Sequence, residues 1–206
     1  MRHTKDAFAN SLTDMKKVVL LGDSIRLIGY GKTVAEHLSP EFEVWQPTEN
    51  CRYAKYTLRG LWEWKKELAG ADIIHWNNGL WDICDIFGDG MFTPIDQYVA
   101  EMTRLARLLL QRARVVIFAT TTPVRPGHPY NDNAMINLAN ETLVPRLREM
   151  GIVINDLHAP ISEDIMRYIG NDMIHLSEEG VALCAERVEG AIRAAAEQIS
   201  RELNQS

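Results

Sequence analysis

The chain has 206 residues, 46% of them hydrophobic, which is enough for one domain with a sizeable core. Its net charge is −6 with both signs interspersed, and no basic patch with interleaved aromatic residues points to a nucleic-acid partner. No apolar run approaches the ~18 residues of a membrane span. The segment 1–16 is charged throughout and lacks the apolar core of a signal peptide. We therefore expect a cytoplasmic protein with an N-terminal extension over 1–16 and a single domain over 17–206.

The cysteine and histidine residues do not suggest a metal site. Cys51, Cys84 and Cys184 are widely spaced without a CxxC pair, which fits neither a disulfide framework nor a zinc site. The histidines show no HExxH or similar ligand pattern. No glycine-rich phosphate-binding motif follows the first apolar run either. We expect no metal and no cofactor.

Short apolar runs alternate along the chain with longer segments of helical periodicity. The runs predict strands over residues 18–21, 42–45, 73–76, 115–119 and 152–155. The periodic segments predict helices over residues 25–38, 56–68, 93–112, 133–150 and 177–203. This alternation predicts an α/β fold, a three-layer α/β/α sandwich around a mostly parallel sheet of about five strands. Loops 46–55, 77–94 and 122–130 follow strands and are expected to form a pocket.

The first predicted strand ends in Gly22, Asp23 and Ser24. Gly22 turns the chain, and either Asp23 or Ser24 is suited to cap the helix that follows. Because open α/β sheets build their sites at the carboxyl ends of strands, Ser24 is a candidate nucleophile. The alternative is that Ser24 is only a helix cap.

Asp172 and His175 lie just before the last predicted helix, which Ser177 begins. An aspartate three residues ahead of a histidine can accept a hydrogen bond from one ring nitrogen in a compact turn. The other ring nitrogen is then free to act as a base, as the Ser-His-Asp mechanism requires. The alternative is a surface histidine beside a helix cap.

Gly-Asp-Ser after the first strand, taken with Asp-x-x-His before the last helix, resembles the SGNH (GDSL-type) hydrolase family over about residues 17–195. The resemblance implies the flavodoxin-like fold of that family and the activity of a serine esterase. It also implies that Ser24 is the nucleophile and that Asp172 and His175 complete the triad.

The family builds its oxyanion hole from the nucleophile's own N–H and from two inner motifs. In this chain, both motifs differ from the family's usual residues. Where the family has a glycine after the second strand, this chain has Lys55, although Gly60 is close enough to leave the alignment open. The resemblance implies that the backbone N–H groups of Ser24 and Lys55 contribute, because a backbone donor needs no glycine unless φ is positive. The alternative is an exposed lysine at the start of a helix.

The second inner motif is normally Gly-x-Asn-Asp, and the chain has Asn-Asn-Gly-Leu at 77–80, as in a divergent branch of the family. A gapless alignment puts Trp81 where the motif asparagine belongs. We expect Asn78 to donate to the oxyanion instead, with Asn77 as the second candidate. The alternative is that both asparagines only shape the turn.

Arg52, Asn77 and Trp81 are the candidate substrate contacts. Arg52 is placed to hold a carboxylate or a sugar hydroxyl, with a structural salt bridge as the alternative, and Trp81 is placed to stack on a sugar ring. The resemblance favours hydrolysis of a small-molecule ester with a small acyl group, acetyl above all, carried on a carbohydrate. The alternative is a catalytically silent relative that binds a glycan or another small molecule.

Overall fold

The computed structural model describes residues 15–205, and the statements below concern this part of the chain. The predicted extension over 1–16 lies outside the described residues except for residues 15 and 16.

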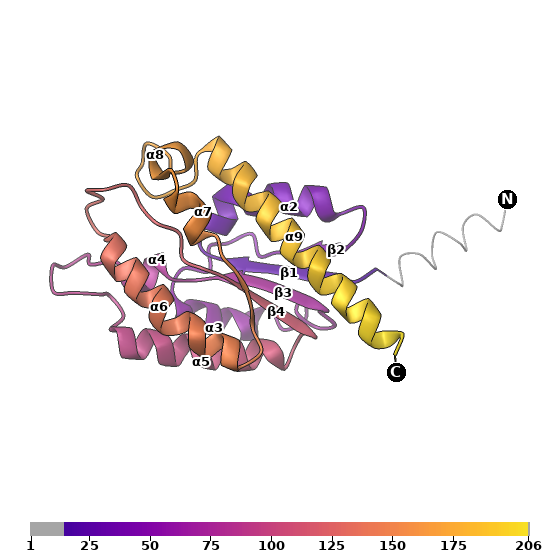
Figure 1. Ribbon diagram of the computed structural model, residues 1–206. Coiled ribbons are helices and arrows are strands. Elements are labelled where there is room, and N and C mark those ends of the chain that lie inside the picture. Colours follow the sequence, from indigo (N-terminus) through magenta and orange to yellow (C-terminus); the bar gives the residue numbers. More distant parts are fainter. Residues whose placement is uncertain (1–14, 206) are drawn as a thin grey trace.

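A parallel sheet of five strands forms the centre of the molecule (Figure 1). The strands are β1 (Lys17–Gly22), β2 (Glu43–Trp45), β3 (Ile73–Asn77), β4 (Val115–Ala119) and β5 (Val153–Asn155). They lie in the order β2-β1-β3-β4-β5, and every neighbouring pair is parallel. This is the flavodoxin-like strand order, in which the winding reverses between β1 and β3.

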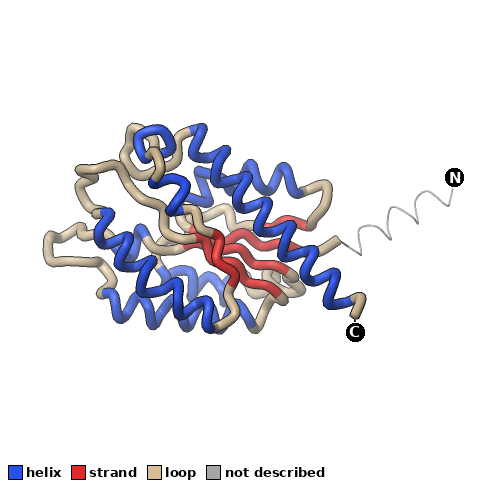
Figure 2. Tube along the Cα trace, viewed as in Figure 1, coloured by secondary structure: helices blue, strands red, loops and turns tan. Residues whose placement is uncertain are grey.

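Helices cover both faces of the sheet and make the three layers visible in Figure 2. The helices are η1 (Ile25–Tyr30), α2 (Gly31–Leu38), α3 (Ala54–Glu63), α4 (Leu80–Ile83), α5 (Ile95–Leu110), α6 (Asn133–Glu149), α7 (His158–Ser162), α8 (Ile165–Tyr168) and α9 (Glu178–Leu203). Helix α9 packs with α2 and η1 on one face, whereas α3, α5 and α6 pack together on the other. The predicted α/β/α sandwich is confirmed.

The strands are continuous apolar runs because both of their faces are buried. Every residue of β3 and β4 is buried, as are all residues of β1 after Lys17. The edge strands β2 and β5 are only partly covered. An unbroken apolar run bounded by turn residues was therefore a good signal for the central strands.

The first predicted helix, over 25–38, is divided in the structure. A π-helix, η1, comes first, and Gly29 interrupts it with non-helical angles (φ −101°, ψ −116°) before α2 begins. A Cβ built at Gly29 would lie 3.1 Å from the Leu176 side chain, so the glycine allows the loop before α9 to approach. The kink brings two distant segments of the chain together.

Two further differences from the predicted elements have local causes. The second helix begins at Ala54 because the Asp82 carboxylate accepts a hydrogen bond from the Ala54 N–H at 2.9 Å. That helix ends at Glu63 and not near residue 68, and turns follow it. The short helix α4 lies in the segment 77–94, which was predicted as a loop, and α7 and α8 lie where no element was predicted. Helices of one or two turns leave too little periodicity to detect.

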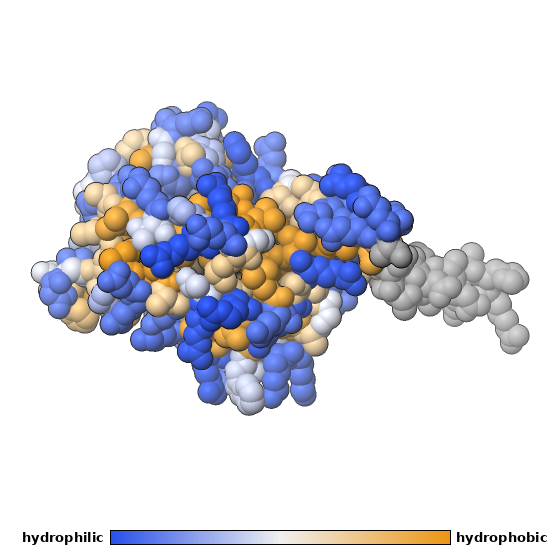
Figure 3. Space-filling view, turned by 60° about the horizontal axis from the view of Figure 1, so that its bottom comes forward, coloured by the Kyte–Doolittle hydropathy of each residue, from blue (hydrophilic) through white to orange (hydrophobic). Residues whose placement is uncertain are grey.

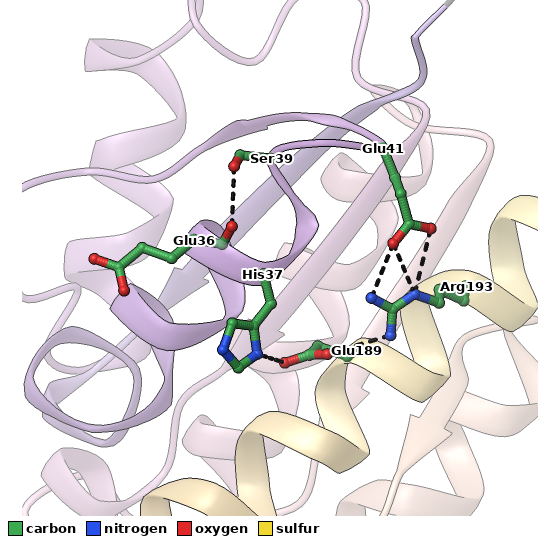
Figure 4. Close-up of polar contacts among 6 residues, drawn as sticks. All are labelled: Glu36, His37, Ser39, Glu41, Glu189 and Arg193. Atoms are coloured by element: carbon green, nitrogen blue, oxygen red, sulfur yellow. Dashed lines mark hydrogen bonds and ion pairs between the residues drawn. The ribbon is translucent and has the colours of Figure 1, made fainter.

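Polar contacts join α9 to the end of α2 (Figure 4). Glu189 of α9 lies 2.8 Å from His37 Nδ1 and accepts from Arg193 at 3.2 Å. Arg193 also reaches Glu41 at 3.0 Å. Exposed contacts of this kind stabilise a fold by only about 0.2–1 kcal/mol each. The docking of α9 therefore depends mainly on its buried apolar side, including Val188 and Ile192.

Apolar side chains are not confined to the core. On the face shown in Figure 3, a band of apolar residues runs between hydrophilic ones.

Within residues 15–205, no helix combines the length and the apolar character needed to cross a bilayer.

Candidate active site

The candidate site lies where the winding of the sheet reverses, between the carboxyl ends of β1 and β3. Gly22, the last residue of β1, is the register partner of Asn77 at the end of β3. The turn after β1 thus brings Asp23 and Ser24 beside the Asn77–Asn78 turn. A Cβ at Gly22 would lie 2.0 Å from Asn77 Oδ1, so only glycine allows this approach. Doubly wound sheets bind their ligands at this position.

The cap of the first helix is provided by Asp23 and not by Ser24. Asp23 Oδ1 accepts a hydrogen bond from the Ile25 N–H at 2.9 Å. Ser24 occupies the N-cap position, yet its side chain makes no capping hydrogen bond. The alternative role predicted for Ser24, a helix cap, is therefore filled by its neighbour, and the hydroxyl is not used in this way.

Asp23 is held in a buried chain of hydrogen bonds beneath Ser24. Asn77 Nδ2 donates to Asp23 Oδ1 at 2.7 Å, and the Tyr30 hydroxyl donates to Asn77 Oδ1 at 3.0 Å. Burial raises the pKa of Asp23 to about 6, although the hydrogen bonds and the charges of Arg26 and His175 oppose it.

Asp172 and His175 form the contact that their spacing predicts. His175 Nδ1 lies 2.7 Å from Asp172 Oδ2, and Asp172 Oδ1 accepts from the backbone N–H groups of His175 (3.0 Å) and Ile174 (3.2 Å). Partial burial acts to raise the pKa of Asp172, but these hydrogen bonds outweigh it and hold the pKa below its ordinary value. An ionised Asp172 fixes the Nδ1–H tautomer of His175 and leaves Nε2 to accept a proton. The start of α9 is as predicted, with Ser177 Oγ accepting from the Gly180 N–H at 3.1 Å.

Ser24 opens into a pocket of about 240 Å³, here called the inner pocket. Its lining comprises Ser24, Leu80, Trp81, Cys84, Ile86, His128, Tyr130, Asn131 and Ile174. Ile174 comes from the Asp172–His175 loop, so segments from both ends of the chain meet there. Among the described residues, the Ser24 hydroxyl forms no hydrogen bond, and so the structure does not join it directly to His175. Such contacts are often long in ligand-free enzymes and tighten when substrate binds.

The expected oxyanion donors lie at the ends of neighbouring elements. Lys55 is in the first turn of α3, where N–H groups have no acceptor within the helix, and its ammonium pairs with Glu101 at 3.0 Å. Asn78 is buried; its amide donates to the Arg52 carbonyl at 2.7 Å and its oxygen accepts from Thr57 at 3.0 Å. An amide nitrogen carries two hydrogens, and this arrangement uses one of them.

The three candidate substrate contacts occupy different places. Trp81 lines the inner pocket and is 41% exposed. The exposed Arg52 guanidinium lies 5.0 Å from the ring centroid of Tyr56 and 6.0 Å from that of Trp81. Among residues 15–205 it forms no ion pair, so the alternative of a structural salt bridge is not realised there. Asn77 is buried, and both polar atoms of its side chain contact Tyr30 and Asp23.

Arg52 has a backbone conformation that L-residues rarely adopt, with φ at 48°. The Asn50 side chain accepts from the Arg52 N–H at 2.7 Å and stabilises this turn. A left-handed residue other than glycine costs roughly 1–2 kcal/mol. The surrounding contacts offset that cost and hold the Arg52 carbonyl toward Asn78.

Arg26 and Asp82 support the walls of the site from inside. The sequence aligned Asp82 with the last residue of the Gly-x-Asn-Asp motif but did not single out Arg26. Arg26 is fully buried, and its guanidinium donates to the carbonyls of Gly22 (3.1 Å), Pro47 (2.8 Å) and Glu49 (2.7 Å). It thereby ties the loop after β2 to the end of β1. An arginine at the second position of a predicted helix carries no signal that it is buried, because most arginines are exposed.

Asp82 accepts from the Ala54 N–H at 2.9 Å and from the Thr93 hydroxyl at 2.9 Å. Burial raises the pKa of Asp82 to about 7, against the influence of these two hydrogen bonds. Asp82 therefore joins α4 to the start of α3, where Lys55 lies.

No family model matches this sequence. No curated protein matches it either. Solved structures do share its fold, each at 16% sequence identity. A lipase/acylhydrolase from Enterococcus faecalis has a TM-score of 0.74, covering 87% of this chain and 96% of its own. The acetyl xylan esterase AlAXEase has a TM-score of 0.71, with coverage of 85% and 99%.

An acetylxylan esterase from Geobacillus stearothermophilus has a TM-score of 0.69, covering 84% of this chain and 92% of its own. Solved catalytic mutants of that esterase replace a serine, an aspartate and a histidine by alanine. Its aspartate and histidine are three residues apart in sequence. The chain thus shares the fold of these esterases and of the lipase/acylhydrolase.

Proposed function

We propose that this protein is a serine esterase that removes a small acyl group, acetyl above all, from an ester carried on a carbohydrate. The observation that carries the proposal is the convergence at one pocket. Ser24, whose hydroxyl does not cap the helix, lines the inner pocket together with Ile174. Ile174 belongs to the loop in which Asp172 contacts His175.

The proposed mechanism is acyl transfer to water. His175 Nε2 takes the Ser24 proton as Oγ attacks the ester carbonyl, and Asp172 stabilises the imidazolium that forms. The tetrahedral intermediate collapses, the C–O bond to the alcohol breaks, and His175 returns the proton to the departing alcohol. Water then attacks the acyl-enzyme, with His175 again as the base, and releases the carboxylic acid and free Ser24.

The oxyanion hole in this proposal comprises the backbone N–H groups of Ser24 and Lys55 and the second amide hydrogen of Asn78. Each such donor typically lowers the barrier by about 2.7–4 kcal/mol. Of the three candidate substrate contacts, Arg52, Asn77 and Trp81, Asn77 is buried and bonded to Tyr30 and Asp23, so we propose Arg52 and Trp81 as the groups that meet the substrate. Trp81 is best placed of the three, because it lines the inner pocket.

Two further observations support the proposal. Two of the similar structures are acetyl xylan esterases, and the spacing of the catalytic aspartate and histidine in one of them equals that of Asp172 and His175. The inner pocket is also small, at about 240 Å³, which favours a short acyl chain over a long one. The cytoplasmic location expected from the charged N-terminal segment stays a prediction.

The test is hydrolysis of p-nitrophenyl acetate, butyrate and octanoate by the wild type and by two serine variants. We expect the acetate to be the best substrate and Ser24→Ala to lose at least 10³-fold in kcat, since the nucleophile acts as a unit with its base. Ser39→Ala is the matched control, because the exposed Ser39 hydroxyl only donates to the Glu36 carbonyl at 2.9 Å. Ser24→Ala with wild-type activity would contradict the proposal, and a preference for octanoate would contradict the small-acyl assignment.

A further inference from the structure

The inner pocket continues into a larger groove of about 670 Å³, here called the outer groove. The outer groove is lined by residues 124–133 from the loop after β4 and by Asp85, Ile86 and Gly88 from the loop after α4. Ile86, His128, Tyr130 and Asn131 line both spaces. The Asp85 N–H donates to the Tyr130 carbonyl at 2.7 Å, which holds the two walls together.

His128 stands at this junction with one ring nitrogen fully engaged. Its Nδ1 accepts from the backbone N–H groups of Asn131 (2.9 Å) and Tyr130 (3.2 Å). A nitrogen that accepts two hydrogen bonds carries no proton, so the ring proton of the neutral imidazole is on Nε2. The Tyr130 ring packs edge-on against the imidazole, with centroids 6.1 Å apart and planes at 75°. Tautomer and ring orientation are both set by the loop itself.

The ring is also kept neutral. Protonation of Nδ1 would turn it from acceptor to donor against two N–H groups and cost both hydrogen bonds. Partial burial lowers the pKa of His128, and the charge of His175 adds to this while that of Asp172 opposes it. His128 is thus a neutral donor at Nε2 and cannot replace His175 as the base through Nδ1.

Two of the other polar side chains at the junction, Asn131 and Cys84, have partners within the protein. The Asn131 amide donates to the Leu80 carbonyl at 3.0 Å, and the Cys84 thiol contacts the Trp81 carbonyl at 3.2 Å. His128 Nε2 has no acceptor among the described residues. It is a pre-oriented donor without a protein acceptor, between the pocket that holds Ser24 and the larger groove.

Resting on the proposed function, we infer that the outer groove binds the alcohol half of the ester and that His128 donates from Nε2 to a hydroxyl or ring oxygen of that half. The acyl group then occupies the inner pocket, and the polyhydroxylated alcohol leaves along the outer groove. His128 is on this account a specificity-determining residue, which binds the alcohol half equally in the ground state and in the transition state. Its loss therefore raises KM and leaves kcat unchanged.

The test compares two acetyl esters in wild type, His128→Asn and His128→Gln, with acetate release as the assay. Methyl 2-O-acetyl-β-xylopyranoside offers oxygens next to the ester, whereas the alcohol half of phenyl acetate has no oxygen apart from the ester itself. Asparagine keeps an acceptor near the position of Nδ1 for the Tyr130 and Asn131 N–H groups, but its shorter side chain places no donor at the position of Nε2. Glutamine places an amide N–H near the position of Nε2. The asparagine variant thus separates the donor from the support of the loop.

We expect His128→Asn to raise KM for the xyloside by roughly tenfold, which corresponds to the loss of one hydrogen bond. The KM for phenyl acetate should stay within about threefold of the wild-type value. His128→Gln should recover part of the xyloside KM. Equal losses on both esters, or no loss on either, would overturn the inference while leaving the esterase proposal intact. If the wild type cleaves neither ester, or if Ser24→Ala cleaves them as fast as the wild type, the proposed function itself is contradicted.

A direct measurement on the unliganded protein tests the same point without activity. The ¹⁵N shifts of the His128 ring should show a bare Nδ1 and a protonated Nε2 at neutral pH. A proton on Nδ1 would overturn the inference.

Discussion

Asp172→Asn is the substitution that tests the predicted base most sharply, because it changes one atom of a contact only 2.7 Å long. Asp172 Oδ1 accepts from two backbone N–H groups, and an amide oxygen can keep both bonds. The amide nitrogen would then replace Oδ2 opposite His175 Nδ1. Because an NH₂ group donates, it favours an imidazole with a bare Nδ1 and a proton on Nε2. That tautomer cannot accept the Ser24 proton.

The magnitude follows from the exposure of the pair. In the serine-protease triad, where the aspartate is buried, the same change lowers kcat by about 10⁴-fold. The Asp172 side chain is 54% exposed here, so water competes for the contact and weakens it. We expect kcat to fall by about 10²–10³-fold, or roughly 3–4 kcal/mol of barrier.

The assay is the turnover of p-nitrophenyl acetate at pH 7, with circular dichroism to verify the fold. Glu178→Gln is the matched control, because it removes one negative charge from the start of α9, close in sequence to His175. Its kcat should stay within about twofold of wild type, because exposed charges interact weakly through water. Asp172→Asn with a kcat within about threefold of wild type would refute the assignment of His175 as the base oriented by Asp172.

Three further predictions concern the support of the site, each measured by urea unfolding. Gly22→Ala should lower the free energy of unfolding by about 1–3 kcal/mol, because the new Cβ would lie 2.0 Å from Asn77 Oδ1. Gly190→Ala should not lower it, because a Cβ there has no neighbour within 4 Å. Equal losses in the two variants would contradict this prediction. Burial raises the pKa of Asp82 from its ordinary value of 3.8 to about 7 in the folded state. Between these two pH values the carboxyl therefore holds a proton in the folded state but not in the unfolded state. The free energy of unfolding should therefore fall as pH rises from about 4 to 7, and Asp82→Asn should flatten this fall; an unchanged slope would count against it. Arg26→Lys should lower the free energy of unfolding by about 3 kcal/mol, because one ammonium group cannot bond all three carbonyls that the guanidinium joins. A loss below about 0.5 kcal/mol would show that these hydrogen bonds are dispensable.

The fold was largely predictable because its signals are local. The apolar runs of β1, β3 and β4 are bounded by turn residues and buried on both faces, so pattern and structure agree. The kink at Gly29 was not predictable, because it interrupts a segment with helical periodicity and the side chain packed there, Leu176, comes from the far end of the chain. The same holds for the early start of α3, which depends on Asp82.

The candidate site divides in the same way. The Asp172–His175 contact follows from a spacing of three residues and was predicted. The role of Asp23 as the cap in place of Ser24 depends on which side chain turns toward the Ile25 N–H, and either type is a good cap. The loop 122–130, which carries His128, was expected to form the pocket, and His128 and Ser24 do line the same pocket. The orientation of the His128 ring was not predictable, because it depends on hydrogen bonds from the Tyr130 and Asn131 N–H groups.

The most direct test of the central claim, that Ser24 is an activated nucleophile, is labelling with a fluorophosphonate probe followed by peptide mass spectrometry. A silent binding protein on the same fold would not react. If the claim holds, one probe molecule attaches to the peptide that contains Ser24, labelling slows strongly in His175→Ala, and labelling disappears in Ser24→Ala. Wild-type protein that stays unlabelled, or that is labelled at another residue, would contradict it.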